Sequence, residues 1–232
     1  MPTAAGRRMP GSILHAAHVL GKQLFGRQAC GMSVSTSKST ARFLLWADAV
    51  GGYLVCQHDE VRLGQAIPGS DVEVPLLADL SRHHATIRRD GGTYLLEPLR
   101  EARLNGRVVQ ATTTLASGSL IELGSALQIR FTIPHPLCAS ARLDVVSRHQ
   151  TRPSTDAILL MADTFVLGPG SRNHVVCRDW SEDVVLFRQH RELLCRTACP
   201  FEVSGTRYER RGPLTLSSRV VAEGFSFSLE QI

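Results

Sequence analysis

From residue 42 onward, apolar and β-branched residues recur in short runs and show no helical spacing. Glycine-containing turn sequences such as GG, PGS, DGG, NG and SGS separate the runs. Many short strands at such close spacing are typical of an antiparallel sandwich or barrel. The pattern therefore predicts an all-β chain, with strands in its first half at residues 42–47, 53–56, 60–63, 72–74, 84–88, 93–96, 103–104, 108–109, 120–123 and 127–133.

The segment HATIRRDGG illustrates this pattern. Side chains alternate across a strand, so Ala85 and Ile87 are predicted to face the core, and Thr86 and Arg88 to face outward. The two glycines after Asp90 supply the positive backbone φ angles that a tight hairpin loop requires. A β-hairpin is therefore expected around this turn.

The chain also repeats itself at an offset of 98 to 104 residues. Ala41-Arg42-Phe43 recurs as Ala141-Arg142-Leu143, and Leu127-x-Ile129-x-Phe131 recurs as Phe225-x-Phe227-x-Leu229. The matches between them keep the same order, with a loop that is four residues longer at SRHQTRPSTD. An ordered series of this kind indicates one unit of about 95 residues used twice. We therefore expect a leader at 1–40 and two domains at 41–135 and 136–232.

The net charge of +5 comes from the leader. Six of the 26 basic residues, and none of the 21 acidic ones, lie within residues 1–47, so the remainder is close to neutral. A face that binds nucleic acid needs basic residues clustered on the folded domain, so no specific nucleic-acid partner is expected. The leader is interpreted as a disordered basic tail, with Met32 as an alternative start; a transit peptide or twin-arginine signal is the other interpretation.

Composition favours a soluble globular protein, with 43% hydrophobic and 20% charged residues. No apolar run reaches the 18 or so residues of a transmembrane helix, so no membrane span is expected. The six cysteines are irregularly spaced, which is typical of reduced, buried thiols and predicts a cytoplasmic location. Their spacing does not complete a zinc site, and neither a metal nor another cofactor is expected.

The sharpest chemical motif is Ser81-Arg82-His83-His84-Ala85-x-Ile87. It belongs to an ordered series that also contains Leu63-Gly64, Tyr94-x-Leu96-Glu97, Asn105-Gly106-Arg107-Val108, Leu115-x-x-Gly118-x-x-Ile121-x-Leu123-Gly124 and Ile129-x-Phe131. Over roughly residues 40–135 this series resembles a forkhead-associated (FHA) domain. The resemblance implies an eleven-stranded β-sandwich of the SMAD/FHA type. Together with the repeat, it implies two antiparallel FHA-like sandwiches in tandem, the second being degenerate.

The resemblance further implies that loops at one end of the sandwich bind a phosphothreonine peptide. A phosphate carries about −1.5 to −2 charges and three acceptor oxygens, so hydroxyl and guanidinium donors suit it. By resemblance, Ser81 and Arg82 match phosphate-contacting positions, His84 matches a loop-bracing histidine, and Gly64 allows a turn in the neighbouring loop. The candidate phosphopeptide-binding residues are Ser81, Arg82, Gly64, Gln65, Arg62, Arg103 and Asn105, and the loop-bracing residues are His84 and Gly106.

Two departures from the family pattern affect this site. Gln65 stands where the family usually has an arginine, and Arg62 either compensates for it or points the wrong way. The family usually has two Asn-Gly pairs, and Asn105-Gly106 fits the second, structural pair. Arg100 and Arg103, in the shortened loop PLREARL, could form an anion pocket of another kind.

The second repeat has Ser181-Glu182-Asp183-Val184 where the first has Ser81-Arg82-His83-His84. Two carboxylates would repel a phosphate, so no phosphate site is expected there. A structural role, or a separate protein contact, is the expectation for this half.

Enzymatic and metal-binding alternatives use the same residues. A serine hydrolase would need His84 to activate Ser81, and the chain has no G-x-S-x-G segment. A metal centre from His58, His83 and His84 is disfavoured because adjacent strand residues point to opposite faces. We therefore expect a non-enzymatic adaptor that binds phosphothreonine-containing proteins, such as substrates of a Ser/Thr kinase. The alternative is a phospho-independent protein–protein scaffold.

Overall fold

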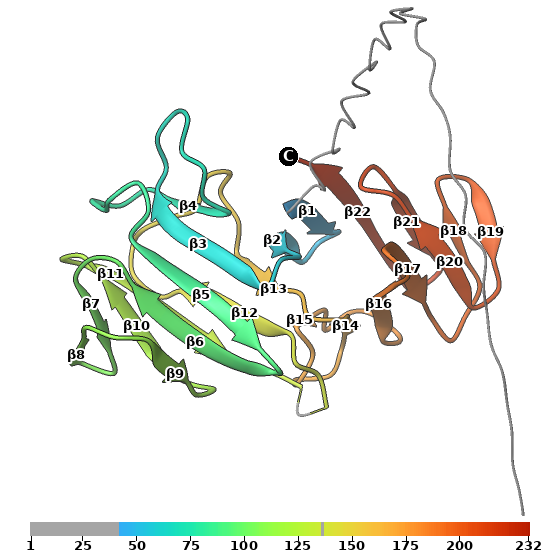
Figure 1. Ribbon diagram of the computed structural model, residues 1–232. Helices are drawn as coiled ribbons and strands as arrows, with labels where there is room; N and C mark the ends of the chain where they lie inside the picture. Colours follow the sequence, from blue (N-terminus) through green and yellow to red (C-terminus); the bar gives the residue numbers. More distant parts are fainter. Residues whose placement is uncertain (1–41, 136) are drawn as a thin grey trace, which may run out of the picture. The chain divides into compact units, whose positions relative to one another are not determined.

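β-Strands are the regular secondary structure of residues 42–135 and 137–232, which are the residues that this computed structural model describes (Figure 1). The first half of the chain contributes β1 (Arg42–Ala47), β2 (Gly51–Cys56), β3 (Glu60–Gln65), β4 (Val74–Leu76), β5 (Ala85–Asp90), β6 (Thr93–Pro98), β7 (Ala102–Leu104), β8 (Arg107–Val109), β9 (Thr113–Leu115), β10 (Leu120–Leu123) and β11 (Leu127–Thr132). The second half contributes β12 (Ala141–Val145), β13 (Ala157–Leu160), β14 (Thr164–Gly168), β15 (Val175–Val176), β16 (Val184–Gln189), β17 (Glu192–Arg196), β18 (Phe201–Val203), β19 (Thr206–Tyr208), β20 (Arg211–Leu214), β21 (Arg219–Ala222) and β22 (Phe225–Gln231). The leader expected at 1–40, including Met32, lies outside the described residues.

The all-β prediction is confirmed; β4 is displaced from its expected position, β9 was not predicted, and several other strands differ by one or two residues at their ends. β4 begins at Val74 because the carbonyl groups of Val72 and Glu73 accept hydrogen bonds from the Arg42 guanidinium, at 2.8 and 2.7 Å. β9 was not predicted, since Leu115 is the one apolar residue in its three. In the part of the chain that is described, no helix has the length and hydropathy to cross a membrane.

The predicted hairpin around Asp90 is present. β5 and β6 pair through Asp90 and Thr93, and the intervening glycines have φ angles of +54° and +88°. Ala85 and Ile87 enter the core as predicted. Thr86 was expected to face solvent but is 7% exposed, and its hydroxyl is hydrogen-bonded to His83 Nε2 at 2.8 Å.

The two halves of the chain use their strands in the same order. One five-stranded sheet has the order β4-β3-β5-β6-β9, and the other has the corresponding order β15-β14-β16-β17-β20. In both sheets the first pair is parallel and the remaining pairs are antiparallel. The repeat seen in the sequence is therefore also a repeat of strand pairing.

The remaining strands form one twelve-stranded sheet with the order β19-β18-β21-β22-β1-β2-β13-β12-β11-β10-β7-β8. In this sheet β11 pairs with β12, and β22 pairs with β1. The first two strands of each half are thus exchanged: β1 and β2 extend the sheet from β22 of the second half, and β12 and β13 extend it from β11 of the first half. Residues on both sides of the boundary expected between residues 135 and 136 contribute to each core.

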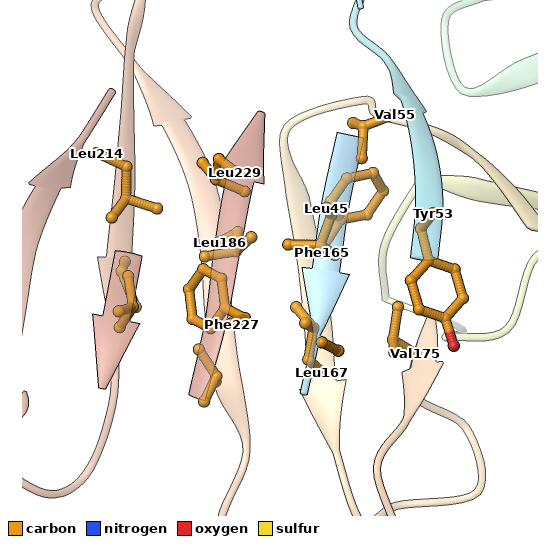
Figure 2. Packing of buried hydrophobic residues seen from close by; sticks show 14 of the residues in the cluster. Leu45, Tyr53, Val55, Phe165, Leu167, Val175, Leu186, Leu214, Phe227 and Leu229 are labelled. Atoms are coloured by element: carbon orange, nitrogen blue, oxygen red, sulfur yellow. The ribbon is translucent and has the colours of Figure 1, made fainter. Parts of the chain in front are cut away.

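Two hydrophobic cores result from this exchange. The first core lies against the β4–β9 sheet and takes Leu143, Ile158 and other residues from beyond residue 135. The second core lies against the β14–β20 sheet and takes Phe43, Leu45 and other residues from β1 and β2. Figure 2 shows Leu45 and Val55 of the first repeat packed beside Phe165 of the second. Neither core is built from one repeat alone.

β2 and β13 lie side by side at the centre of the long sheet and pair in parallel. Their side chains alternate between the two cores: Tyr53 and Val55 belong to the second core, and Leu54 and Cys56 belong to the first. Parallel strands buried on both faces read as continuous apolar runs, which accounts for YLVC and AILL in the sequence.

The exchanged pairing predicts which cysteine pairs can be cross-linked. Trp46 faces Ser228 across β1 and β22, while Arg130, the repeat counterpart of Ser228, faces Asp144. Partners in an antiparallel pair have Cα atoms about 4.5–5.5 Å apart, within disulfide range. Trp46→Cys with Ser228→Cys, and Arg130→Cys with Asp144→Cys, should oxidise to intramolecular disulfides detectable by peptide mass spectrometry. Trp46→Cys with Arg130→Cys should not, and a disulfide in that pair would contradict the exchange.

Candidate functional site

The motif loop before β5 is held tightly against the end of β3. The Gln65 amide donates a hydrogen bond to the Ser81 carbonyl at 3.0 Å, and the His84 amide donates to the Leu63 carbonyl at 2.9 Å. A Cβ atom at Gly64 would overlap the carbonyl oxygen of Arg82. Glycine is therefore needed here because the loop backbone approaches the strand so closely.

His84 connects this loop to the loop between β6 and β7. Its ring is buried, with Nδ1 accepting from the Ser81 amide at 3.3 Å and Nε2 donating to the Glu101 carbonyl at 2.9 Å. The His84 carbonyl also accepts hydrogen bonds from the amides of Leu99 and Arg100, at 3.0 and 3.1 Å. The histidine thus holds two loops in a fixed relation, as the resemblance implies.

Three polar side chains remain available at this end of the sheet. Ser81 is partly exposed, and Arg82 is exposed; neither side chain makes a hydrogen bond or ion pair with the residues that the structure describes. Arg100 is exposed, and its guanidinium donates to the carbonyl of its own neighbour, Leu99, at 3.0 Å. A hydroxyl and two guanidinium groups on braced loops can bind an oxyanion by charge-assisted hydrogen bonds.

Arg62 is not part of this set. Its guanidinium pairs with Glu73 at 2.7 Å and with Asp71 at 3.1 Å. The hydrogen bond to Glu73 is the main cause that raises the pKa of Arg62 further above its usual value. Because the two carboxylates neutralise its positive charge, Arg62 does not compensate for the neutral Gln65 in attracting an anion.

Arg103 and Arg88 also have acidic neighbours. Arg103 projects from β7 near Glu101, at 3.7 Å, and stands opposite Glu122 of β10. Arg88, on β5, pairs with Glu97 at 2.7 Å. The structure therefore leaves Arg82 and Arg100 as the unpaired arginines beside Ser81.

Asn105 and Gly106 form the turn between β7 and β8. Their φ angles are +52° and +79°, the left-handed values of a tight hairpin turn. The Asn105 side-chain oxygen accepts from the Leu120 amide at 2.8 Å, and the Gly106 amide donates to Glu122 at 3.0 Å. The Asn105 side-chain oxygen is thus engaged in holding the turn against β10.

The catalytic alternative is not supported by the geometry. Both ring nitrogens of His84 are engaged by main-chain groups, so neither is free to accept a proton from the Ser81 hydroxyl. His83 Nε2 is engaged by Thr86. Within residues 42–135 and 137–232, no three His, Cys, Asp or Glu side chains are grouped to hold a metal ion.

The corresponding loop of the second half is braced by a carboxylate. Glu182, which aligns with Arg82, accepts hydrogen bonds from the amides of Ala198 and Cys199, at 2.7 and 3.2 Å. Asp183 accepts from the Asn173 side chain at 2.6 Å. Both carboxylates are thus held within the second half's own loops, where their negative charge would repel an incoming anion.

A further segment reaches the first site, and sequence reasoning missed it. The β12–β13 loop lies against β4, with the Leu77 amide donating to the Gln150 carbonyl at 2.8 Å and the Arg152 amide donating to Pro75 at 2.9 Å. Figure 1 shows this loop beside β4. It carries Arg148 and Arg152. The sequence-based division places these residues in the domain at 136–232, because it does not include the exchange of strands. The sequence feature that could have indicated a role for this loop is its length, because the segment SRHQTRPSTD makes it longer than the corresponding loop of the first repeat.

The residues of this site lie within a recognisable family segment. Residues 61–124 match the family model of the FHA domain. This segment matches the FHA domain. The match includes Gly64, the Ser81–His84 loop and the Asn105-Gly106 turn, so the resemblance expected from the sequence is confirmed for this part of the chain.

Several solved structures are similar over about a third of the chain. EmbR of Mycobacterium tuberculosis, in complex with a low-affinity phosphopeptide, is 29% identical, with 35% of this chain and 22% of EmbR covered and a TM-score of 0.27. The FhaA FHA domain, complexed with the intracellular domain of Rv3910, is 28% identical, with 35% and 91% covered and a TM-score of 0.28. The FHA domain of CT664 from Chlamydia trachomatis is 24% identical, with 36% and 89% covered and a TM-score of 0.28. No curated protein matches this chain significantly.

The close approach at Gly64 predicts a local destabilisation. Gly64→Ala should lower the free energy of unfolding by about 1–3 kcal/mol, because the added methyl group meets backbone that must move. Gly69→Ala, at a φ of +74° with open space around its Cβ position, should cost about 1 kcal/mol through backbone strain alone. Denaturant unfolding compares the two variants. Equal costs would argue against the tight loop packing.

His174, in the loop before β15, predicts a dependence of stability on pH. The residue is fully buried, and burial lowers its pKa to about 4. Between pH 6.5 and 4 the unfolded chain therefore binds a proton that the folded chain does not, so stability falls as the pH falls. The loss should reach about 3 kcal/mol at pH 4. His174→Gln should flatten this slope in denaturant unfolding, whereas the exposed control His58→Gln should leave it unchanged.

Proposed function

We propose that this chain is a non-enzymatic adaptor whose FHA domain binds phosphothreonine-containing proteins, such as substrates of a Ser/Thr kinase. The observation that carries the proposal is the exposed, unpaired Arg82 next to Ser81, on a loop held by Gly64 and His84. The family match over residues 61–124 supports it.

Each group has a defined role in this proposal. The Ser81 hydroxyl donates to a phosphate oxygen, and the Arg82 guanidinium makes charge-assisted hydrogen bonds that can be bidentate. Arg100 supplies positive charge from the neighbouring loop, in place of the arginine that the family usually has at the position of Gln65. Because His84 and the close packing at Gly64 hold the loop backbone in place, binding costs little ordering.

The affinity is expected to be modest. A hydrogen bond to a charged group contributes about 1.5–3 kcal/mol. Gln65 is neutral and cannot make a charge-assisted hydrogen bond to the phosphate. Arg62 is already paired with Glu73 and Asp71. The same facts favour the second candidate function, a phospho-independent protein–protein scaffold in which the FHA loop architecture is retained without phosphate recognition.

We also infer that the second half is a diverged copy of the first, with its leading hairpin exchanged. The corresponding strand orders support this inference. Glu182 and Asp183 disfavour an anion at its loops, so its role is structural or lies in contact with another protein.

We place the protein in the cytoplasm. Cys56, Cys177 and Cys195 are buried as free thiols, and desolvation raises the pKa of each to about 12, as suits unreactive thiols in a reducing compartment. Neither a metal nor another cofactor enters this proposal, and none of the described residues is assigned a catalytic role.

Calorimetric titration of the full chain with a phosphothreonine peptide library tests the proposal. Phosphorylated peptides should bind, and unphosphorylated ones should bind at least tenfold more weakly, given about 1.5–3 kcal/mol for each charged hydrogen bond. Ser81→Ala and Arg82→Ala should each weaken phosphopeptide binding about tenfold or more. Ser181→Ala, at the aligned position of the second half, is the matched control and should have no effect. Binding indifferent both to the phosphate and to these variants would establish the phospho-independent scaffold instead.

A further inference from the structure

The strand exchange places a loop of the second half at the FHA ligand-binding end. β12 and β13 close the first core, so the loop between them emerges beside β4, the edge strand of the five-stranded sheet. Thr151 forms an isolated β-bridge with Leu76, and the Gln128 amide donates to the Ser147 hydroxyl at 3.1 Å. The loop is thus attached both to β4 and to β11, and its backbone position is set before any ligand arrives.

The loop carries positive charge that nearby carboxylates offset only in part. Arg148 and Arg152 are exposed, and neither side chain makes a hydrogen bond or ion pair with the described residues. Of the acidic residues at the loop's two ends, Asp144 is paired with Arg142 at 2.8 Å, whereas Asp156 accepts a hydrogen bond from the neutral Gly52 amide at 2.8 Å and keeps its charge. Asp79, in the loop between β4 and β5, is an exposed carboxylate that partly offsets this charge.

The corresponding position in the second core is different in length and charge. There the short β1–β2 turn, residues 48–50, takes the place of residues 146–156. It contains Asp48, which pairs with Arg219 at 3.1 Å. The exchange therefore gives the long basic loop to the FHA end that has Ser81 and Arg82, and an acidic turn to the end that has Glu182.

Main-chain contacts set the span between the two groups of arginines. Ser81 is bonded to Gln65, Gln65 is aligned with Leu76, and Leu76 is bridged to Thr151. Three steps between neighbouring backbones, at about 4.8 Å each, place Ser81 and Thr151 at most roughly 14 Å apart. An extended peptide covers that distance in about four residues.

We propose that Arg148 and Arg152 form a second anion subsite, which binds an acidic side chain about three to four residues from the phosphothreonine of the ligand. This inference rests on the proposed function. Carboxylates suit the subsite because two unpaired guanidinium groups stand within peptide reach of the phosphate position. The site makes acidic flanking sequence a determinant of which phosphoproteins bind.

The test uses phosphothreonine peptide pools with Glu fixed at three and four residues on both sides, and matched pools with Gln at those positions. Fluorescence anisotropy measures their affinity for the full chain, for Arg148→Gln/Arg152→Gln, and for the control Arg107→Gln/Arg130→Gln. The control removes the same charge from exposed residues on β8 and β11. Thermal unfolding of each variant checks that the fold is retained.

The wild-type chain and the control should prefer the Glu pool by about fivefold, as two exposed ion pairs suggest. Arg148→Gln/Arg152→Gln should lose this preference and keep its affinity for the Gln pool. A preference that survives in this variant, or is absent from the wild type while Ser81→Ala abolishes binding, overturns the subsite alone. Failure of the wild type to bind either pool contradicts the proposed function and the subsite together.

Discussion

The parallel pairing of β2 with β13 is the contact on which the rest of the structure depends. These two strands join the halves of the twelve-stranded sheet, and their side chains contribute alternately to both cores. Fully burying an aliphatic side chain contributes about 1.5–3 kcal/mol. Val55 and Leu54, adjacent in sequence, contribute this to different cores, so a change in the position of either strand affects both cores at once.

This constraint makes the FHA segment dependent on the second half of the chain. The family match ends at residue 124, yet Leu143 and Ile158 are fully buried in the same core as Ile87 and Leu96. The β12–β13 loop then covers the edge of β4, where unpaired main-chain groups would otherwise be exposed. The end of the sheet that carries Ser81 and Arg82 is consequently composed of residues from both halves of the chain, although the loops of the second half are themselves held by carboxylates.

Sequence patterns predicted local structure well and long-range pairing poorly. The alternation in HATIR and the glycines after Asp90 determine local backbone geometry, and the hairpin was found where it was expected. The exchange could not be predicted in this way, because Ala41-Arg42-Phe43 and Ala141-Arg142-Leu143 are similar enough for either to pair beside β11. The continuous apolar runs YLVC and AILL were the sequence feature that indicated strands buried on both faces. A strand with one face in solvent would instead alternate apolar and polar residues.

In the candidate site, too, some features could be predicted from the sequence and others depend on contacts that the fold brings together. Ser81 and His84 lie in one short segment, and the position of Gly64 beside them was expected from the family resemblance. The availability of each arginine did not, because it depends on partners brought together by the fold: Arg62 is engaged by Glu73, while Arg82 is left free. Charge at this end is therefore set by which carboxylates the loops bring near, and not by the number of arginines in the segment. By that criterion Arg148 and Arg152, from the other repeat, are better candidates for the proposed anion subsite than Arg62 and Arg103, which have carboxylate neighbours in the first half.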